Sequence, residues 1–395
     1  MENYKDAPRT NWRTMNEGSI SGKKRIGVVR PDPHGLLYAY CMQECRRSDF
    51  LDCGGQIYIM DNGFIPSLPL RGVSITGVCR EMTRPSPNWK PEEYKAANDW
   101  CGKALWNPEN FAKCFECPIY DTVEDMANPE LFDGIIIGNC SWKAEDHVEL
   151  AMPFIKAGIP IFIDKPFANN ARDAALLLNA AREYNTPIFS SSILYFDDIQ
   201  AELARKNLGR AHMLIASFER PLAHRKGSVH LLSTLLGAMR VTNGHNHKVE
   251  SIRYIGNGAP AMSRDEAHHD AYCVTFDDGT LGILNAEGFG EYGFEIKAFC
   301  ERGTATQYSE IPAMRGGIVY IAQEFVNMMY TKNPPLDYDR LFEIVAVLDA
   351  GIRSRDEGRE VTLDEIAAEA GWVYGGKDHD PDAERFIPKE RGGRG

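Results

Sequence analysis

The sequence of 395 residues has no continuous apolar run close to the roughly 20 residues that a membrane-spanning helix needs. Its first 24 residues are polar and have no apolar core, so they show no secretory signal. Basic residues are not in excess either, because the formal net charge is -12, which disfavours nonspecific binding to nucleic acid or to anionic membranes. We therefore expect a cytoplasmic protein with a small-molecule partner and no nucleic-acid or membrane partner.

A second cysteine pair at zinc-finger spacing is also missing. The 10 cysteines are scattered, and Cys114-Phe-Glu-Cys117 is a lone CxxC pair, so we expect free thiols in a reducing compartment. Cys41 and Cys45 would share one helix face with Cys53 nearby, which keeps a metal site open as the alternative. Our prediction is that the protein holds no metal.

What is present is the composition of an ordinary globular chain, with 43% apolar and 25% charged residues, long enough for two or three domains. Up to about residue 194, short apolar runs alternate with helical segments. Buried strands are expected at 25–29, 73–79, 133–138, 161–163 and 187–191. This alternation predicts a Rossmann-like, doubly wound parallel sheet whose strands all end at one edge.

The pattern changes after about residue 195. Strands are expected at 211–219, 249–255, 271–276, 281–286 and 294–300, with a hairpin turn at Asp277-Asp-Gly-Thr280. Helices are expected at about 316–331 and 339–356. This half therefore predicts an α+β domain with an open, mostly antiparallel sheet.

The predicted organisation has four parts. They are a polar N-terminal arm at 1–23, a dinucleotide-binding domain at 24–194, a substrate-binding and oligomerisation domain at 195–372, and a polar tail at 373–395. An insert at about 82–118 is longer than a normal connection, and such inserts often shape a site or an interface. Its tryptophans, Trp89, Trp100 and Trp106, are each expected to fill the core.

Glycine is scarce where a dinucleotide fold usually needs it. In the turn Arg30-Pro-Asp-Pro-His-Gly35, Arg30 and Asp32 occupy the first two glycine positions of the GxGxxG fingerprint, and only Gly35 remains. The order of strand, tight turn and helix still predicts a helix amino end placed against a phosphate. An ordinary strand-to-helix turn is the alternative.

Arg80 ends the second predicted strand, where dinucleotide folds place an acidic residue that binds the ribose hydroxyls. An arginine there suits a 2′-phosphate and points to NADP. The alternative is a side chain that only faces solvent.

The motif Asp164-Lys165-Pro166 directly follows the predicted strand 161–163, and Asn169 and Asn170 can cap the next helix. Ligands bind at the carboxyl ends of strands in α/β sheets, and a lysine between a carboxylate and a proline is held in place. The motif therefore indicates a functional lysine, with a charged strand-to-helix turn as the alternative.

Together, in this order, these features resemble the Gfo/Idh/MocA oxidoreductases, which include glucose–fructose oxidoreductase and inositol 2-dehydrogenase. The matching segments are 132–138, 147–151, 157–168, 227–237 and 325–363. The resemblance covers roughly residues 24 to 368, and the ordered set is far more specific than any single motif.

The resemblance implies roles for particular residues. Lys165 corresponds to the lysine of the family's Glu-Lys-Pro motif, beside the nicotinamide and the substrate hydroxyl. His230 resembles the general base of the second domain, and His224 is a second substrate-binding candidate. The implied cofactor-binding residues are Arg30, Asp32, His34, Gly35, Arg80, Asn139, Cys140, Asp164 and Lys165.

The sequence also departs from the family. Asp164 replaces the usual glutamate, and Lys226 and Ser233 stand where the family often has aspartates around its histidine. His268 and His269 are expected at the surface or in sheet packing. A helix histidine with a structural role is the alternative for His230.

The chemistry supports a lysine and a histidine in these roles. Hydride loss from a carbinol needs its hydroxyl proton removed in step, by a base within about 3 Å of the oxygen. A histidine with a pKa of about 6.5 or a desolvated lysine can accept it, and a protonated lysine would stabilise the alkoxide.

We therefore predict an NAD(P)-dependent oxidoreductase that transfers hydride at a carbinol of a sugar, glycoside or polyol. Because open sheets often pair across subunits, we expect a homodimer or a homotetramer. Two alternatives remain open. One is a non-catalytic sugar-binding or scaffold protein on the same fold. The other is an enzyme that uses tightly bound NAD(P) for an internal redox cycle, giving elimination or epimerisation.

Overall fold

A six-stranded parallel sheet, sheet A, organises the N-terminal half of the computed structural model. The structure describes residues 23–43, 45, 49, 52, 70–101, 105–139, 143–196, 198–218, 225–244, 247–256, 270–286, 293–310 and 315–375. The strands are β1 (Lys24–Val29), β2 (Val73–Cys79), β3 (Ile119–Tyr120), β4 (Gly134–Ile137), β5 (Ile161–Ile163) and β6 (Ile188–Phe189). Their spatial order is β3-β2-β1-β4-β5-β6, and every pair is parallel. This confirms the predicted Rossmann-like sheet, whose direction of winding reverses between β1 and β4.

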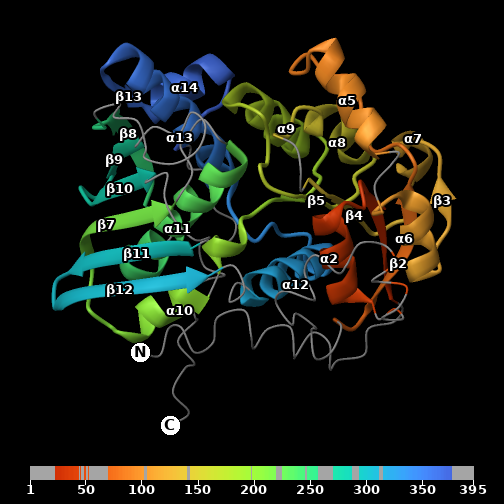
Figure 1. The fold of residues 1–395 in the computed structure, drawn as a ribbon, viewed down its shortest axis with the longest axis horizontal. Helices are drawn as coiled ribbons and strands as arrows, with labels where there is room; N and C mark the ends of the chain where they lie inside the picture. The colour runs from red at the N-terminus through yellow and green to blue at the C-terminus, as the bar shows by residue number, and fades with distance from the viewer. Residues whose placement is uncertain are drawn as a thin grey trace, which may run out of the picture.

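Helices cover both faces of sheet A, as that reversal requires. Right-handed crossovers wind one way from β1 to β2 and the other way from β4 to β5, so their helices lie on opposite faces. Accordingly, α2 (Pro33–Met42) lies on one face, and α8 (His147–Lys156) and α9 (Ala171–Glu183) lie on the other (Figure 1). The carboxyl ends of the strands are left at one edge, where a ligand can be held.

The insert at 82–118 contributes two helices, α5 (Pro91–Cys101) and α6 (Pro108–Phe115). The short α7 (Val123–Met126) follows β3, and a 3₁₀ turn, η2 (Ile193–Tyr195), follows β6. The rings of Trp100 and Trp106 lie 5.2 Å apart, and those of Trp89 and Tyr94 lie 5.6 Å apart. Trp89 is buried, but Trp100 and Trp106 are only half-buried, so the expected core-filling role is not met by these two.

A second sheet, sheet B, organises the C-terminal half. Its strands are β7 (Ala211–Phe218), β8 (Val249–Tyr254), β9 (Asp270–Phe276), β10 (Leu281–Ala286), β11 (Gly293–Cys300), β12 (Gly303–Glu310) and β13 (Glu360–Thr362), in the order β12-β11-β7-β10-β9-β8-β13. Among the described strand pairs of sheet B, only the β10–β7 pair is parallel. The predicted mostly antiparallel α+β half is therefore confirmed, with β12 and β13 added at its edges.

One face of sheet B is buried against helices. The helices of this half are α10 (Asp198–Arg205), α11 (Arg225–Asn243), α13 (Tyr338–Glu357) and α14 (Leu363–Ala370). Residues alternate along β7, where Leu214 and Ala216 are fully buried while their neighbours Met213 and Ile215 are only partly buried. Since successive strand residues point to opposite faces, this alternation leaves the outer face uncovered in one chain.

The helix α12 (Arg315–Thr331) returns to sheet A, although it follows sheet B in the chain. It lies beside α2 (Figure 1), and the Phe325 ring lies 6.0 Å from that of Phe162 on β5. A Cβ atom on Gly134 of β4 would lie 2.4 Å from the sulfur of Met329, so this helix approaches the sheet too closely for a side chain there. The domain boundary near residue 195 stays a prediction. The helix α12 lies beyond that boundary in the chain, yet it packs against the first half.

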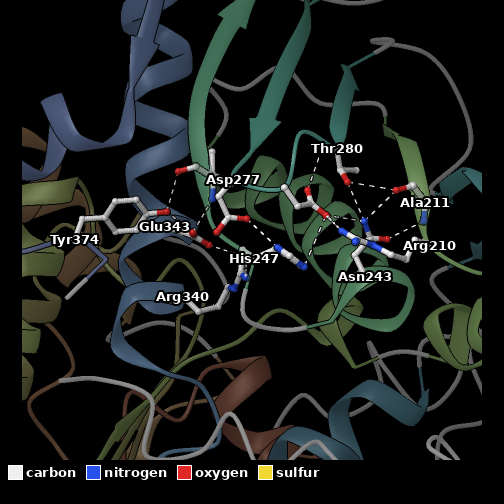
Figure 2. A network of polar contacts seen from close by, with 11 residues as sticks. Arg210, Ala211, Asn243, His247, Asp277, Thr280, Arg340, Glu343 and Tyr374 are labelled. Atoms are coloured by element: carbon white, nitrogen blue, oxygen red, sulfur yellow. Dashed lines mark hydrogen bonds and ion pairs between the residues drawn. The ribbon is translucent and has the colours of Figure 1, made fainter. Parts of the chain in front are cut away.

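Two polar clusters fix the helices α11 and α13 to sheet B (Figure 2). In one, the Asn243 amide donates to the Ala211 carbonyl at 3.0 Å and to the Thr280 hydroxyl at 2.8 Å. In the other, Glu343 accepts from the Val249 amide at 2.9 Å and also bonds with Tyr374. These contacts hold the ends of β7 and β8 against the helices.

His247, Asp277 and Asp278 bring potential metal-ligand atoms within 4.8 Å of one another, a group that the sequence reasoning did not single out. Hydrogen bonding accounts for its geometry. His247 Nδ1 lies 2.9 Å from Asp277 Oδ1, and Asp278 is held by Arg210 at 2.7 Å and by Asn243 at 3.0 Å.

Most of the predicted N-terminal arm and C-terminal tail lie outside the described residues, which do not include 1–22 and 376–395. Within the described part, no helix is both long enough and apolar enough to cross a bilayer. The described cysteines are free thiols, and burial raises the pKa of Cys117 in the CxxC pair to about 12, which disfavours the thiolate that a metal would need.

Candidate active site

The turn between β1 and α2 is tight and is capped by its own aspartate. Arg30 has φ 56°, a left-handed conformation that is uncommon outside glycine. Asp32 is the N-cap of α2, and its carboxylate accepts from the amides of His34 at 3.1 Å and Gly35 at 3.0 Å. A Cβ atom on Gly35 would lie 2.7 Å from the Arg30 carbonyl oxygen, so only glycine fits this approach.

The Arg30 side chain is fully buried and bonded within the protein, which differs from a role in lining a phosphate. Its guanidinium lies 2.7 Å from both carboxylate oxygens of Asp146, and it donates to the Met82 carbonyl at 2.9 Å. The carboxylate of Asp146 is also completely buried. The pair thus sits where β1 and β4 diverge, and both charges are matched inside the protein.

Asp164 and His34 form a close pair at the end of β5. His34 Nδ1 lies 2.5 Å from one oxygen of Asp164, and the Tyr38 hydroxyl donates to the other at 3.2 Å. Burial alone would raise the pKa of Asp164, but His34 and Lys165 lower it to about 2. The carboxylate is therefore ionised at neutral pH, and Nδ1 of His34 carries the proton that it donates.

Lys165 is 5% exposed and follows directly after Asp164. The pairing of β5 with β6 matches Ile161 with Ile188 and Phe162 with Phe189. Lys165 therefore follows β5, and Ser192 follows the neighbouring β6, at the same carboxyl edge of sheet A. One residue beyond β5, the Asp164 amide still donates to the Ile137 carbonyl of β4 at 2.9 Å, which holds the start of the Asp-Lys-Pro segment against the sheet.

His230 of α11 reaches the same edge of sheet A. Its Nδ1 lies 2.6 Å from the Ser192 hydroxyl, which also accepts from the Leu194 amide at 3.2 Å. The imidazole packs edge-on against Phe294 of β11, with ring centroids 5.7 Å apart. The structure therefore brings a helix of the second half to the strand end that neighbours Lys165.

His147 is a buried residue of this region to which the sequence reasoning gave no role. Its Nδ1 donates to the Phe167 carbonyl at 3.1 Å, two residues after Lys165, and its Nε2 has no hydrogen-bond partner among the described residues. Burial, and to a smaller extent the nearby Arg30 charge, lower the pKa of His147 to about 4. The neutral ring therefore fixes the backbone of the Asp-Lys-Pro segment.

We expect His147 to make the stability of the protein pH-dependent. An unfolded histidine has a pKa near 6.5, so unfolding takes up a proton between about pH 6.5 and pH 4. The stabilisation is present above this window and is lost as the pH falls through it, by about 3 kcal/mol in total. In urea unfolding at several pH values, His147→Asn should flatten this slope, and the exposed His212→Asn should not. Equal slopes in both variants would contradict the assignment.

Arg80 is exposed and paired at the end of β2. Its guanidinium lies 3.1 Å from Asp121 and also bonds with Glu109. Two carboxylates beside it neutralise the charge that a 2′-phosphate would need. Arg80 thus has partners of its own rather than only facing solvent.

The structure describes some of the remaining candidate residues and not others. Asn139, two residues after β4, is fully buried, and Ser233 is buried on α11. Cys140, His224, His268 and His269 and the side chain of Lys226 lie outside the described residues.

Sequence reasoning missed four residues that build this region: Tyr38, Asp146, His147 and Ser192. For Asp146 and Ser192, contact with distant segments is what gives them a role. The cap at Asp32 did have a local signal, because aspartate followed by proline is a favoured start of a helix.

Strand order, the switch point and a buried lysine at the end of β5 define a dinucleotide-type oxidoreductase fold. Residues 102–191 match the family profile GFO_IDH_MocA, described as an oxidoreductase family with an NAD-binding Rossmann fold. The resemblance to the Gfo/Idh/MocA oxidoreductases that the sequence indicated is thus confirmed over residues 102–191, the segment that the family profile matches. No curated protein sequence matches the chain at a significant level.

Solved structures with the same fold are similar over most of the chain. A putative myo-inositol dehydrogenase from Sinorhizobium meliloti 1021 is 14% identical, with a TM-score of 0.59 over 86% of this chain and 100% of its own. The apo scyllo-inositol dehydrogenase from Lactobacillus casei is 12% identical, with a TM-score of 0.59 over 88% and 100%. GenD2 from gentamicin A biosynthesis, in complex with NAD, is 14% identical, with a TM-score of 0.59 over 87% and 97%. At these identities the likeness establishes the fold.

The candidate site fits the nicotinamide end of a dinucleotide better than it fits the pyrophosphate. Around Lys165 the chain provides a buried cation, the ionised Asp164 and a histidine on the adjoining element, which suits the reactive end of such a cofactor. At the turn after β1, the carboxylate of Asp32 occupies the helix amides that usually bind the pyrophosphate. The pyrophosphate therefore does not fit this turn in the usual way.

Proposed function

We propose that the protein is an NAD(P)-dependent oxidoreductase that acts on a carbinol of a sugar, glycoside or polyol. The observation that carries the proposal is the buried Lys165 at the end of β5, beside the neighbouring strand β6, after which Ser192 holds His230. The family match over residues 102–191 supports the oxidoreductase class and the nicotinamide cofactor. Structural neighbours named as inositol dehydrogenases support a polyol-like substrate.

The chain's own residues divide the proton chemistry between them. A bound nicotinamide supplies the acceptor for the substrate hydride. Asp164, which is ionised at neutral pH, stabilises the positive charge of Lys165, and a protonated Lys165 stabilises a developing alkoxide. His230 takes the hydroxyl proton as the general base, and Ser192 orients its ring. In this proposal Lys165 stabilises the charge on the substrate oxygen and His230 removes its proton.

Between the two nicotinamide cofactors, we propose NAD. The 2′-phosphate of NADP would approach the end of β2, where Glu109 and Asp121 flank Arg80. Their negative charges disfavour a further phosphate there.

Binding of the cofactor is the direct test of this function. Titration with NADH and NADPH, followed by nicotinamide fluorescence, should show saturable binding, with NADH binding the more tightly. Absorbance of the purified protein in the reduced-nicotinamide band would instead indicate a trapped nucleotide and the internal redox alternative. If neither nucleotide binds and none is released on denaturation, the non-catalytic alternative holds. The self-capped turn at Asp32 is the observation that favours that alternative.

We also propose that the protein is a homodimer or homotetramer, joined through the outer face of sheet B. Partly exposed apolar side chains gather on that face, including Ile215 on β7, Leu281 and Ile283 on β10, and Tyr308 on β12, which is 55% exposed. An uncovered sheet face with apolar residues is typical of a subunit interface. Light scattering tests this, and a monomer at micromolar concentration would rule it out.

A further inference from the structure

The first turn of α2 has no amide hydrogen left for a ligand. The first four residues of a helix normally offer unbonded N–H groups. Here Pro33 has none, His34 and Gly35 donate to the Asp32 carboxylate at 3.1 and 3.0 Å, and Leu36 donates to the Asp32 carbonyl at 2.8 Å. Each of the four residues from Pro33 to Leu36 therefore has no amide hydrogen or donates it to Asp32.

The carboxylate of Asp32 is also enclosed at the switch point of sheet A. Asp32 is completely buried. A Cβ atom on Gly138, directly after β4, would lie 2.6 Å from its Oδ1 and 2.4 Å from the Arg30 carbonyl oxygen. The carboxylate thus lies between the ends of β1 and β4, in the crevice where such folds hold a dinucleotide.

A carboxylate and a pyrophosphate compete for the same place. Both are anions stabilised by the N–H groups and the positive end of a helix dipole. We propose that Asp32 takes the place of the pyrophosphate at the start of α2, so that it limits the affinity of this chain for its dinucleotide. This inference rests on the proposed function, and it makes Asp32 a determinant of cofactor affinity rather than a cofactor-binding residue.

The test compares cofactor binding in variants at position 32. Asp32→Gly removes both the charge and the acceptor and restores the second glycine of the fingerprint. Asp32→Asn removes the charge and keeps an oxygen that can accept from the same amides. Asp337→Gly is the matched control, because Asp337 caps α13 in the same way, accepting from the Arg340 amide at 2.7 Å. Asp32→Ala replaces the glycine variant if that variant does not fold.

Binding of three ligands shows which part of the cofactor the substitution at position 32 affects. The first is NADH. ADP-ribose carries the pyrophosphate without nicotinamide, and adenosine carries no phosphate. We expect Asp32→Gly to bind NADH and ADP-ribose at least tenfold more tightly than the unmodified protein, and adenosine equally. Asp32→Asn should fall between the two, and Asp337→Gly should bind like the unmodified protein. Thermal melting verifies that each variant is folded.

The results distinguish a failure of this inference from a failure of the proposed function. If the unmodified protein binds NADH and the glycine or alanine variant binds it equally or more weakly, this inference is overturned and the proposed function stands. Equal tightening for adenosine would also overturn it, because the effect would not lie at the pyrophosphate. If no form binds NADH, NADPH or ADP-ribose, both the inference and the nicotinamide cofactor are overturned.

Discussion

Replacing Lys165 by alanine is expected to reduce kcat by about 10²- to 10⁴-fold while leaving dinucleotide binding largely unchanged. The expectation follows from the position of Lys165, which is 5% exposed, next to an ionised carboxylate and at the same sheet edge as the serine that holds His230. A buried ammonium at this point stabilises negative charge that exists on the substrate oxygen only during reaction. Its removal should therefore affect turnover far more than binding.

The measurement is steady-state turnover of a polyol panel together with NADH titration of the same preparation. Lys165→Met is the matched variant, because it retains the length and packing of the side chain without the charge. Both variants should lose turnover alike if charge is what matters. Turnover close to that of the unmodified protein in the methionine variant would remove Lys165 from the mechanism.

Replacing Arg30 by methionine is expected to destabilise the protein by about 3–5 kcal/mol. Arg30 and Asp146 are both completely buried, and the substitution leaves the carboxylate without its counter-ion inside the protein. An uncompensated buried charge costs more than the pair contributes. Urea unfolding followed by circular dichroism measures the change.

Two companion variants make this experiment specific. Arg80→Met removes an exposed arginine with two carboxylate partners and should leave stability nearly unchanged, because solvent screens such pairs. In the double variant Arg30→Met, Asp146→Asn, neither position carries an unpaired buried charge, and the asparagine oxygen can still accept from the Arg84 amide. The double variant should recover most of the stability that Arg30→Met loses. A single variant as stable as the unmodified protein would show that the pair is not needed.

The first half of the fold could be predicted because its strands are short, continuous apolar runs. The expected strands at 73–79 and 161–163 match β2 and β5 at both ends. Burial on both faces of a parallel sheet requires such runs, so the signal is local. In contrast, β12 is Gly-Thr-Ala-Thr-Gln-Tyr-Ser-Glu at a sheet edge, where no apolar pattern is needed, and it was missed. α14 was not expected as a separate helix either.

Within the site, sequence reasoning found positions but not the direction of side chains. Arg30 and Asp32 were placed correctly in the turn after β1. Only the fold shows that the Arg30 guanidinium binds Asp146, 116 residues away, and that Asp32 caps α2. Such a contact depends on the packing of β1 against β4, which no local pattern encodes.

By itself, the sequence determined the order of strands and helices, the break in pattern near residue 195, and the place of Lys165 at a strand end, because hydrophobic periodicity and motif spacing are local properties. The tertiary structure decided which groups meet: His230 with Ser192, His34 with Asp164, and Asp32 with the amides of α2. The reason is physical, since buried charges and donors are satisfied by whatever partner packing brings near, and that partner often lies far away in the chain.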